Sequence, residues 1–188
     1  SKLREFVSVK DFGAMGDGNH DDYEALQASI DFAAKQGGGS ILLKGNGKYK
    51  ISQTLIIRKG VWLGSLGGHF NIESINYQSG MPKIFVSNGF AGSVIAFDTL
   101  PNGTCLSGIL IDCTDQASGN GVDFLEAKVK RRSNATIEKT MILNAKDNGI
   151  NVPQNCCELV LRENCIYGSG KNGLSIDGLD HHIMLCYF

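Results

Sequence analysis

The sequence predicts a parallel β-helix, an all-β solenoid, with a single α-helix that covers its N-terminal end. Two observations support this prediction. The first is a recurring Asn-Gly-aliphatic triplet whose glycines, Gly121, Gly149 and Gly173, are 28 and 24 residues apart. The second is one amphipathic helix ahead of many short apolar runs, which we expect to be strands. Repeats of this length are typical of solenoids, in which each coil buries its inner face by stacking on its neighbours.

The α-helix is expected over about residues 22–36. Asp21 or Asp22 can accept the free amide protons of its first turn, and Gly37, Gly38 and Gly39 end it. The face expected to be buried comprises Tyr23, Leu26, Gln27, Ile30, Ala33 and Ala34, and the opposite face comprises Glu24, Ser29, Asp31 and Lys35. Since the open end of a β-helix exposes apolar interior and unpaired backbone, we interpret this helix as the N-terminal cap.

We expect residues 1–47 to form the cap and residues 48–188 to form the coils. Short strands are predicted at 40–44, 48–52, 54–57, 61–64, 83–86 and 93–97, with a long loop or flap at 67–81. The last residues, Leu185 to Phe188, stop partway through a coil. We therefore expect either a fragment of a longer solenoid or a partner that covers this edge.

Aligning the repeat predicts which side chains share a column. Ile109, Ile137, Leu161 and Leu185 are expected in one apolar column. Two inward columns are expected to contain Val122, Ile150 and Leu174, and Phe124, Val152 and Ile176. The alternative fold is a β-sandwich with coincidental Asn-Gly turns, which explains the joint repetition of strand lengths and turns less well.

The composition excludes several classes of partner and cofactor. The chain has 188 residues and a formal net charge of -1, so we expect no nucleic acid partner, and its apolar runs are too short for membrane insertion. The six cysteines do not have paired metal-ligand spacing, and we expect small buried groups rather than ligands. His181, His182 and Cys186 could be imagined as metal ligands together with Cys156 and Cys157. By strand alternation, however, Cys157 is expected to point inward and Cys156 outward, so these side chains do not converge. No metal or other cofactor is therefore expected.

The opening stretch of the chain resembles the N-terminal signature of the pectate-lyase-like superfamily. The resemblance rests on Val9 to Gly18 (VKDFGAMGDG), on Asp21-Asp22, on the three glycines after the helix and on the segment from Gly47 to Ile51 (GKYKI). It implies a right-handed parallel β-helix that binds a polysaccharide along its side. It transfers no catalytic residue to this chain.

Four residues are candidates for polysaccharide contact. Asp123, Asn151 and Ser175 are expected in one outward column, and Trp62 is a candidate aromatic platform for a sugar ring, with a place in the core as its alternative. Phe70 and Tyr77 would extend that platform or pack within their loop.

No pair of acidic residues is predicted to form a hydrolytic site. Glycoside hydrolysis needs two nearby carboxylates, and Asp177 is expected on the order of 12 Å from Asp123, which is too far. Glu138 is expected to pair with Arg162 of the next coil. The catalytic residues stay unknown.

The leading functional hypothesis is a phage tailspike or tail appendage, located on the virion, that binds and degrades bacterial surface or cell-wall polysaccharide. Resemblance to tailspikes implies a homotrimer, which would also cover outward apolar residues such as Leu110 and Val160. The alternatives are a secreted polysaccharide lyase or polygalacturonase-like hydrolase, and a structural or adhesive module without turnover. The enzyme class and the glycan remain open.

Overall fold

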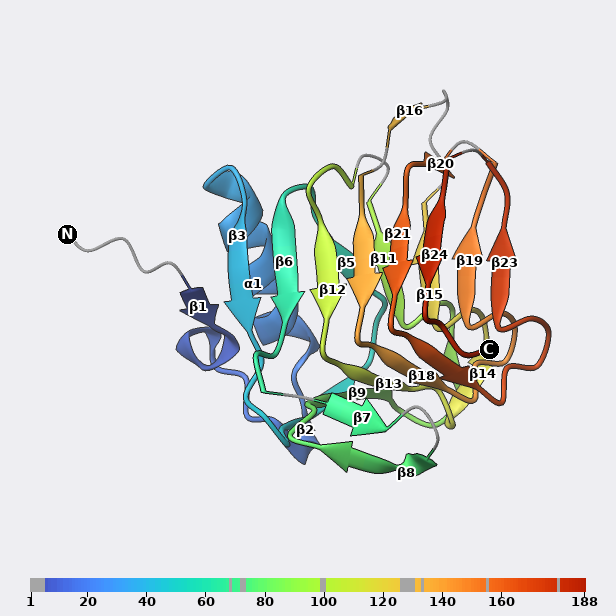
Figure 1. The fold of residues 1–188 in the computed structure, drawn as a ribbon. Helices are drawn as coiled ribbons and strands as arrows, with labels where there is room; N and C mark the ends of the chain where they lie inside the picture. Colours follow the sequence, from blue (N-terminus) through green and yellow to red (C-terminus); the bar gives the residue numbers. More distant parts are fainter. Residues whose placement is uncertain are drawn as a thin grey trace.

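The chain folds into a right-handed parallel β-helix with an α-helix at its N-terminal end (Figure 1). The computed structural model describes all residues except 1–5, 68, 72, 73, 99, 100, 126–130, 133, 155 and 179. Successive coils stack in parallel register, so the predicted fold class is confirmed. The division of the chain into a cap and coils at residue 47 stays a prediction. Strands before that residue pair with strands after it, so the two parts share the same sheets.

Three parallel sheets, called A, B and C, form the sides of the β-helix. Sheet A contains β1 (Phe6–Ser8), β3 (Gly39–Leu42), β6 (Val61–Gly64), β12 (Cys105–Ser107), β17 (Thr136–Glu138), β21 (Val160–Arg162) and β24 (His182–Met184). Sheet B contains β2 (Asp17–Asp21), β4 (Lys48–Ile51), β9 (Lys83–Val86), β13 (Leu110–Asp112), β18 (Met141–Leu143) and β22 (Cys165–Tyr167). Sheet C contains β5 (Leu55–Ile57), β11 (Ile95–Phe97), β15 (Val122–Phe124), β19 (Ile150–Val152) and β23 (Leu174–Ile176).

Smaller elements occupy the turns between these sheets. β10 (Phe90–Ala91) pairs with β14 (Gln116–Ser118) between sheets B and C, and β16 (Arg131–Arg132) pairs with β20 (Cys156–Cys157) between C and A. A 3-10 helix, η1 (Val9–Phe12), precedes β2. The expected flap contains an antiparallel hairpin of β7 (His69–Asn71) and β8 (Ser74–Ser79).

The inward columns predicted for sheet C are confirmed. Val122 pairs in register with Ile150, which pairs with Leu174, and Val152 pairs with Ile176. Val122, Ile150 and Val152 are fully or almost fully buried in one continuous apolar core.

The predicted column of Ile109, Ile137, Leu161 and Leu185 is wrong at both ends. Leu106, not Ile109, pairs with Ile137, and Ile183, not Leu185, pairs with Leu161. The turn from sheet B to sheet C spans 113–121 in the third full coil but only 144–149 in the next, so counting back from the glycine misses the true partner. The turn before β24 is likewise shorter, 177–181 against 153–159 one coil earlier.

The Asn-Gly repeat forms an asparagine ladder. The side-chain oxygen of Asn120 accepts hydrogen bonds from the backbone N–H and Nδ2 of Asn148, both at 3.0 Å, and Asn148 receives the equivalent bonds from Asn172. A Cβ atom on Gly149 would lie 2.2 Å from the Ile166 side chain and 2.6 Å from the carbonyl oxygen of the next coil. Glycine is therefore required here by close stacking of the coils.

The cap helix, α1 (Tyr23–Lys35), begins and ends within a residue of the expected bounds. Asp21 accepts the Tyr23 amide at 3.1 Å, whereas the buried Asp22 carboxylate accepts the amides of Met15 and Gly16 instead of capping the helix. Ser29 was expected on the exposed face, but it is fully buried, and its hydroxyl donates to the Leu26 carbonyl at 2.7 Å. This local hydrogen bond satisfies the hydroxyl without water, so serine is tolerated on the buried face of the helix.

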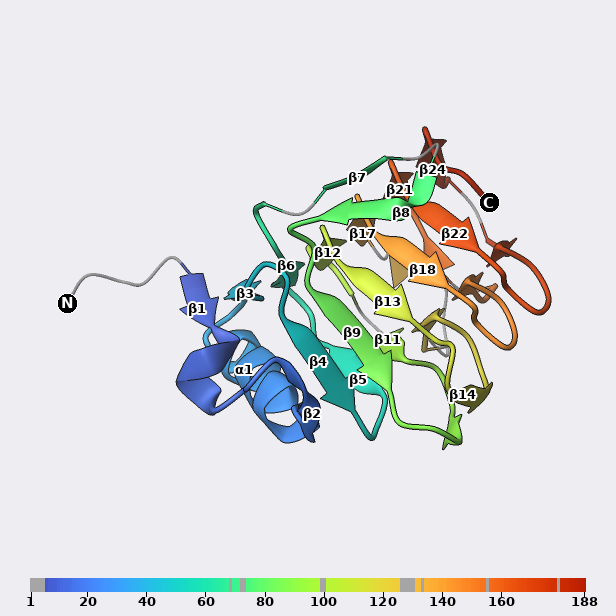
Figure 2. The ribbon, with the colours of Figure 1, turned by 90° about the horizontal axis from the view of Figure 1, so that it is seen from below.

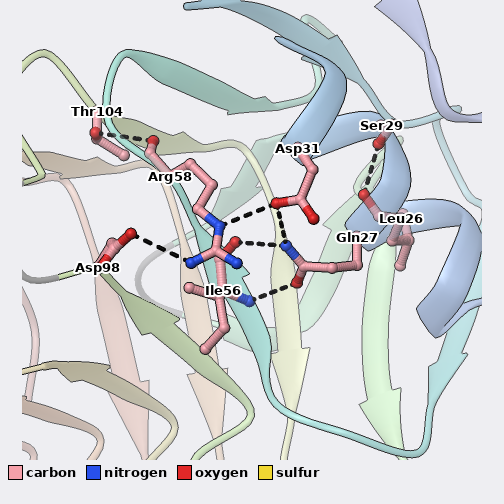
Figure 3. Close-up of polar contacts among 8 residues, drawn as sticks. All are labelled: Leu26, Gln27, Ser29, Asp31, Ile56, Arg58, Asp98 and Thr104. Atoms are coloured by element: carbon pink, nitrogen blue, oxygen red, sulfur yellow. Dashed lines mark hydrogen bonds and ion pairs between the residues drawn. The ribbon is translucent and has the colours of Figure 1, made fainter. Parts of the chain in front are cut away.

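The helix also closes the first edge of sheet C through Gln27 (Figure 3). β5 is the edge strand of this sheet. The Gln27 side-chain oxygen accepts the Ile56 amide at 2.9 Å, and Nε2 donates to the Ile56 carbonyl at 3.1 Å. The Gln27 side chain thus makes the two hydrogen bonds that a neighbouring strand would make to the backbone of Ile56.

A charged network beside Gln27 fastens the helix to the first two full coils (Figure 3). Arg58 Nε donates to Asp31 of the helix at 2.9 Å, and its Nη1 donates to Asp98 at 3.2 Å. The pKa of Arg58 is raised above its ordinary value, chiefly by the hydrogen bond to Asp31.

The β7–β8 hairpin lies against the outer face of sheet B (Figure 2). Leu110, predicted to point outward, does so, but it is only 6% exposed and packs in a second apolar cluster with Met81, Met141 and Cys165. Leu110 is therefore already covered within the chain, and the homotrimer stays a prediction. Among the described residues, none of the helices is long and apolar enough to cross a membrane.

Left-handed backbone residues bend the chain on both sides of sheet A. One set lies two residues before the first outward residue of a sheet A strand, and the other directly follows the last outward residue of such a strand. The first set is Gly60, Gly103, Asn134, Glu158 and Asp180, and the second is Gly108, Lys139, Glu163 and Leu185. Because a side chain is strained in this conformation, non-glycine residues there reduce stability.

Replacing Gln27 by leucine should lower the free energy of unfolding by about 1–3 kcal/mol, because the Ile56 N–H and carbonyl would lose their partners beneath the helix. Chemical denaturation followed by circular dichroism measures this loss. Gln36→Leu, at the exposed end of the same helix, is the control and should leave stability nearly unchanged. Equal stability of the two variants would show that Gln27 does not cap the edge.

Replacing Lys139 by glycine should raise the free energy of unfolding by about 0.5–1 kcal/mol, since Lys139 has a φ of 49° and glycine adopts this conformation without strain. Lys146→Gly, at an exposed position outside the left-handed set, should lower stability by a similar amount through chain entropy. Thermal melts of both variants measure the two effects. A loss of stability in both would contradict the strain.

Candidate functional site

The four candidate contact residues lie on two different sides of the β-helix. Asp123, Asn151 and Ser175 are consecutive in one outward column of sheet C, as predicted. Trp62 lies on β6, in sheet A. The structure therefore brings three of the candidates together and separates the fourth, and their role as polysaccharide contacts stays a prediction.

Asp123 is held by hydrogen bonds from its own and neighbouring coils. Its Oδ1 accepts Asn151 Nδ2 at 2.9 Å and the Phe124 amide at 3.0 Å. Its Oδ2 accepts Ser93 Oγ and Asn120 Nδ2, both at 3.1 Å. These contacts join the carboxylate to the asparagine ladder, so its first role is to hold coils together.

Trp62 points outward from sheet A, because its neighbours Val61 and Leu63 are fully buried and adjacent side chains of a strand alternate in direction. Its alternative placement in the core is therefore wrong. The indole ring covers Gly64, where a Cβ atom would lie 2.8 Å from Cζ2 and 2.9 Å from Cη2 of the ring. The half-buried ring thus lies over Gly64 on the face of the sheet.

The predicted ion pair between Glu138 and Arg162 is confirmed on the same face. Ser107 Oγ donates to Glu138 Oε1 at 3.1 Å, and Arg162 binds Oε2. Ser107, Glu138 and Arg162 occupy one column on three successive strands. The hydrogen bond to Glu138 raises the pKa of Arg162, which is the more exposed partner, at 46% of its side chain against 19%.

Cys105 lies between Trp62 and Thr136 in the adjacent column of sheet A. Burial, together with the nearby negative charge of Glu138, raises the pKa of its thiol to about 12. A raised pKa favours the protonated thiol at neutral pH, which is a weak nucleophile. A hydrogen bond with the Trp62 side chain partly opposes this rise, so Cys105 contacts the indole from the neighbouring strand.

The outer face of sheet A thus presents an aromatic ring, hydroxyls, one carboxylate and one guanidinium on β6, β12, β17 and β21. We call this set, Trp62, Ser107, Thr136, Glu138 and Arg162, the sheet A face. Its rows repeat at the stacking interval of about 4.8 Å. Glu138 is the one carboxylate among the described outward strand residues of sheet A, so these strands do not supply the pair that glycoside hydrolysis needs.

The described cysteines and histidines do not gather into a metal site. No group of three or more His, Cys, Asp or Glu residues in the described part of the chain could hold a metal ion. Cys156 was expected to point outward, but it is 3% exposed and lies in the core. Its coil bends at Glu158, which has a φ of 59°, so strict alternation does not hold there. The side chain of Cys157 lies outside the described residues.

Comparison of the sequence with curated proteins finds polysaccharide-modifying enzymes of Azotobacter vinelandii. Alginate lyase 7 is 29% identical over 182 residues, which cover 90% of this chain and 20% of that protein. Mannuronan C5-epimerase AlgE4 is 26% identical over 180 residues, covering 92% of this chain and 32% of that protein. The chain thus spans less than a third of the length of either relative.

Comparison with solved structures finds the same fold in enzymes and tailspikes. The A-module of Azotobacter vinelandii mannuronan C-5 epimerase AlgE4 has a TM-score of 0.64 at 19% identity and covers 89% of this chain and 52% of its own. A tailspike protein mutant of E. coli bacteriophage HK620, in complex with pentasaccharide, has a TM-score of 0.65 at 16% identity, with coverage of 98% and 34%.

A family model matches most of the chain. The matching family model is described as "Rhamnogalacturonase A/epimerase, pectate lyase-like", and the match extends over residues 6–178, from β1 to the turn that follows β23. The chain therefore belongs to the rhamnogalacturonase A/epimerase family of pectate-lyase-like proteins.

Proposed function

We propose that this β-helix binds a polysaccharide along the sheet A face. The observation that carries the proposal is the position of Trp62, whose ring lies over Gly64 on the same face as the Glu138–Arg162 pair. An aromatic ring contacts the apolar face of a sugar, and fixed polar groups beside it bind hydroxyls or charge. A polymer can use several such rows because the coils repeat them at a constant interval.

The proposed ligand is a uronate polysaccharide of the alginate type. The names of the relatives, alginate lyase and mannuronan C5-epimerase, support this class. The exposed guanidinium of Arg162 supports it independently, since a planar cation binds a carboxylate through parallel hydrogen bonds. For the whole protein we propose lyase or epimerase chemistry, both of which remove the proton next to the uronate carboxylate.

A second candidate is a phage tail appendage, a homotrimer on the virion, that binds or degrades host polysaccharide. Tailspike structures that share this fold support it. A secreted enzyme and an adhesive module without turnover are the remaining alternatives. Light scattering tests the phage appendage: a trimer in solution supports it, and a monomer contradicts it.

Binding should be visible through Trp62, the single tryptophan of the chain. We expect alginate and polymannuronate, but not neutral dextran, to shield Trp62 fluorescence from iodide quenching. Arg162→Gln should weaken this binding about tenfold, since it removes a charged hydrogen-bond donor. Lys35→Gln, an equal loss of charge on the exposed side of the cap helix, is the control. Unchanged quenching with every uronate polymer would reject the proposal.

Turnover is a separate measurement with the same polymers. New unsaturated uronate ends, detected by ultraviolet absorbance, would identify a lyase, and exchange of the C5 proton with deuterium from solvent would identify an epimerase. New saturated reducing ends would contradict both and favour hydrolysis. Binding without any product would favour the adhesive module.

A further inference from the structure

The outer face of sheet B presents two rows of side chains, because each strand directs its first and third residues outward. The first row contains Lys48, Lys83, Leu110, Met141 and Cys165. The second row contains Lys50, Phe85, Asp112, Leu143 and Tyr167.

The two rows differ in how far they are covered. Leu110, Met141 and Cys165 of the first row are buried in the second apolar cluster, on the side of the sheet where β8 crosses (Figure 2). In the second row Tyr167 is 50% exposed, and Phe85 and Leu143 are half-buried. A partly exposed row of ring and methyl surface, called the open row below, therefore runs beside the hairpin, and Leu143 also packs against the second apolar cluster.

A polar network lies across this open row. Lys83 Nζ binds Asp112 Oδ2 at 2.6 Å and stands 5.5 Å from the centre of the Phe85 ring. Thr114 Oγ1 donates to Asp112 Oδ1 at 2.6 Å and accepts from Asn144 Nδ2 at 3.0 Å. Burial alone would raise the pKa of Asp112, but the hydrogen bonds from Lys83 and Thr114 outweigh it and hold the pKa below its usual range.

We propose that a second stretch of the polysaccharide binds along this row, stacking on Phe85, Leu143 and Tyr167. The inference rests on the proposed function and adds a separate contact face to it. Sugar hydroxyls would meet the oriented groups of Asp112, Thr114 and Asn144, and sugar faces would meet the rings. Phe85 and Tyr167 are three coils apart, about 14 Å, so a single sugar cannot reach both and an extended polymer can.

The chemistry of the row favours a glycan over a protein partner. An extended peptide adds to a sheet through an open strand edge. The row lies on the face of sheet B, where the backbone groups are already paired between strands. The ionised Asp112 also interrupts the apolar surface between Phe85 and Leu143, which a well-packed protein interface avoids.

The test measures migration in native gels that contain alginate, with Phe85→Ala and Tyr167→Ala as variants. Each should weaken binding about three- to tenfold, the value of one aromatic contact. Tyr167→Phe keeps the ring and should bind like the wild-type protein. Phe32→Ala, at an aromatic residue of the cap helix with a similar exposure of 44%, is the control, and thermal melts check that every variant is folded.

Trp62 fluorescence separates this inference from the proposed function. If Phe85→Ala and Tyr167→Ala bind like Phe32→Ala while Arg162→Gln binds weakly, the second face is rejected and the first stands. If the sheet B variants weaken binding but alginate still shields Trp62 at saturation, both faces are supported. If the wild-type protein does not bind alginate in either assay, the proposed function fails, and this inference fails with it.

Discussion

The backbone hydrogen bonds between successive coils hold this molecule together, and they require a first coil whose own edge is satisfied. Sheet C begins at β5, and there the side-chain amide of Gln27 makes the two bonds that a neighbouring strand would make. Arg58 adds an ionic connection, because it binds Asp31 of the helix and Asp98 of the following coil. The helix is therefore part of the hydrogen-bonded stack as well as a cover for the apolar core.

The same register that buries the interior also determines the outside. Once Val122 and Ile150 stack, Asp123 and Asn151 stack as well, and the asparagines before them form a ladder. Every outer face is consequently a set of rows with one side chain per coil. Such a surface is suited to a polymer that also repeats, because neighbouring residues of the ligand meet neighbouring rows of the protein.

The fold could be predicted from the sequence because the Asn-Gly triplets recur wherever coils pack closely, as the lack of space for a Cβ at Gly149 shows. The columns of sheet A were harder to predict. A longer turn in one coil moves the partner of Ile137 from Ile109 to Leu106, and the hairpin separates Trp62 from Cys105 in sequence. Ile137 and Glu138 could be paired correctly with Leu161 and Arg162 beforehand, because the turns from sheet B to sheet C have equal lengths in these two coils. Trp62 and Asp123 consequently seemed equivalent candidates although they lie on different sheets.

The two acidic candidates differ in how their oxygens are used, and this difference favours the sheet A face. Asp123 accepts four hydrogen bonds from its own and neighbouring coils, so a ligand would have to break the ladder to reach it. Glu138 instead orients Arg162, whose guanidinium has five N–H donors and an exposed side chain. A carboxylate of the ligand can bind the remaining donors without disturbing the coil. The indole of Trp62 lies three strands away from this cation, so the face suits an extended acidic polymer, which is the ligand that we propose.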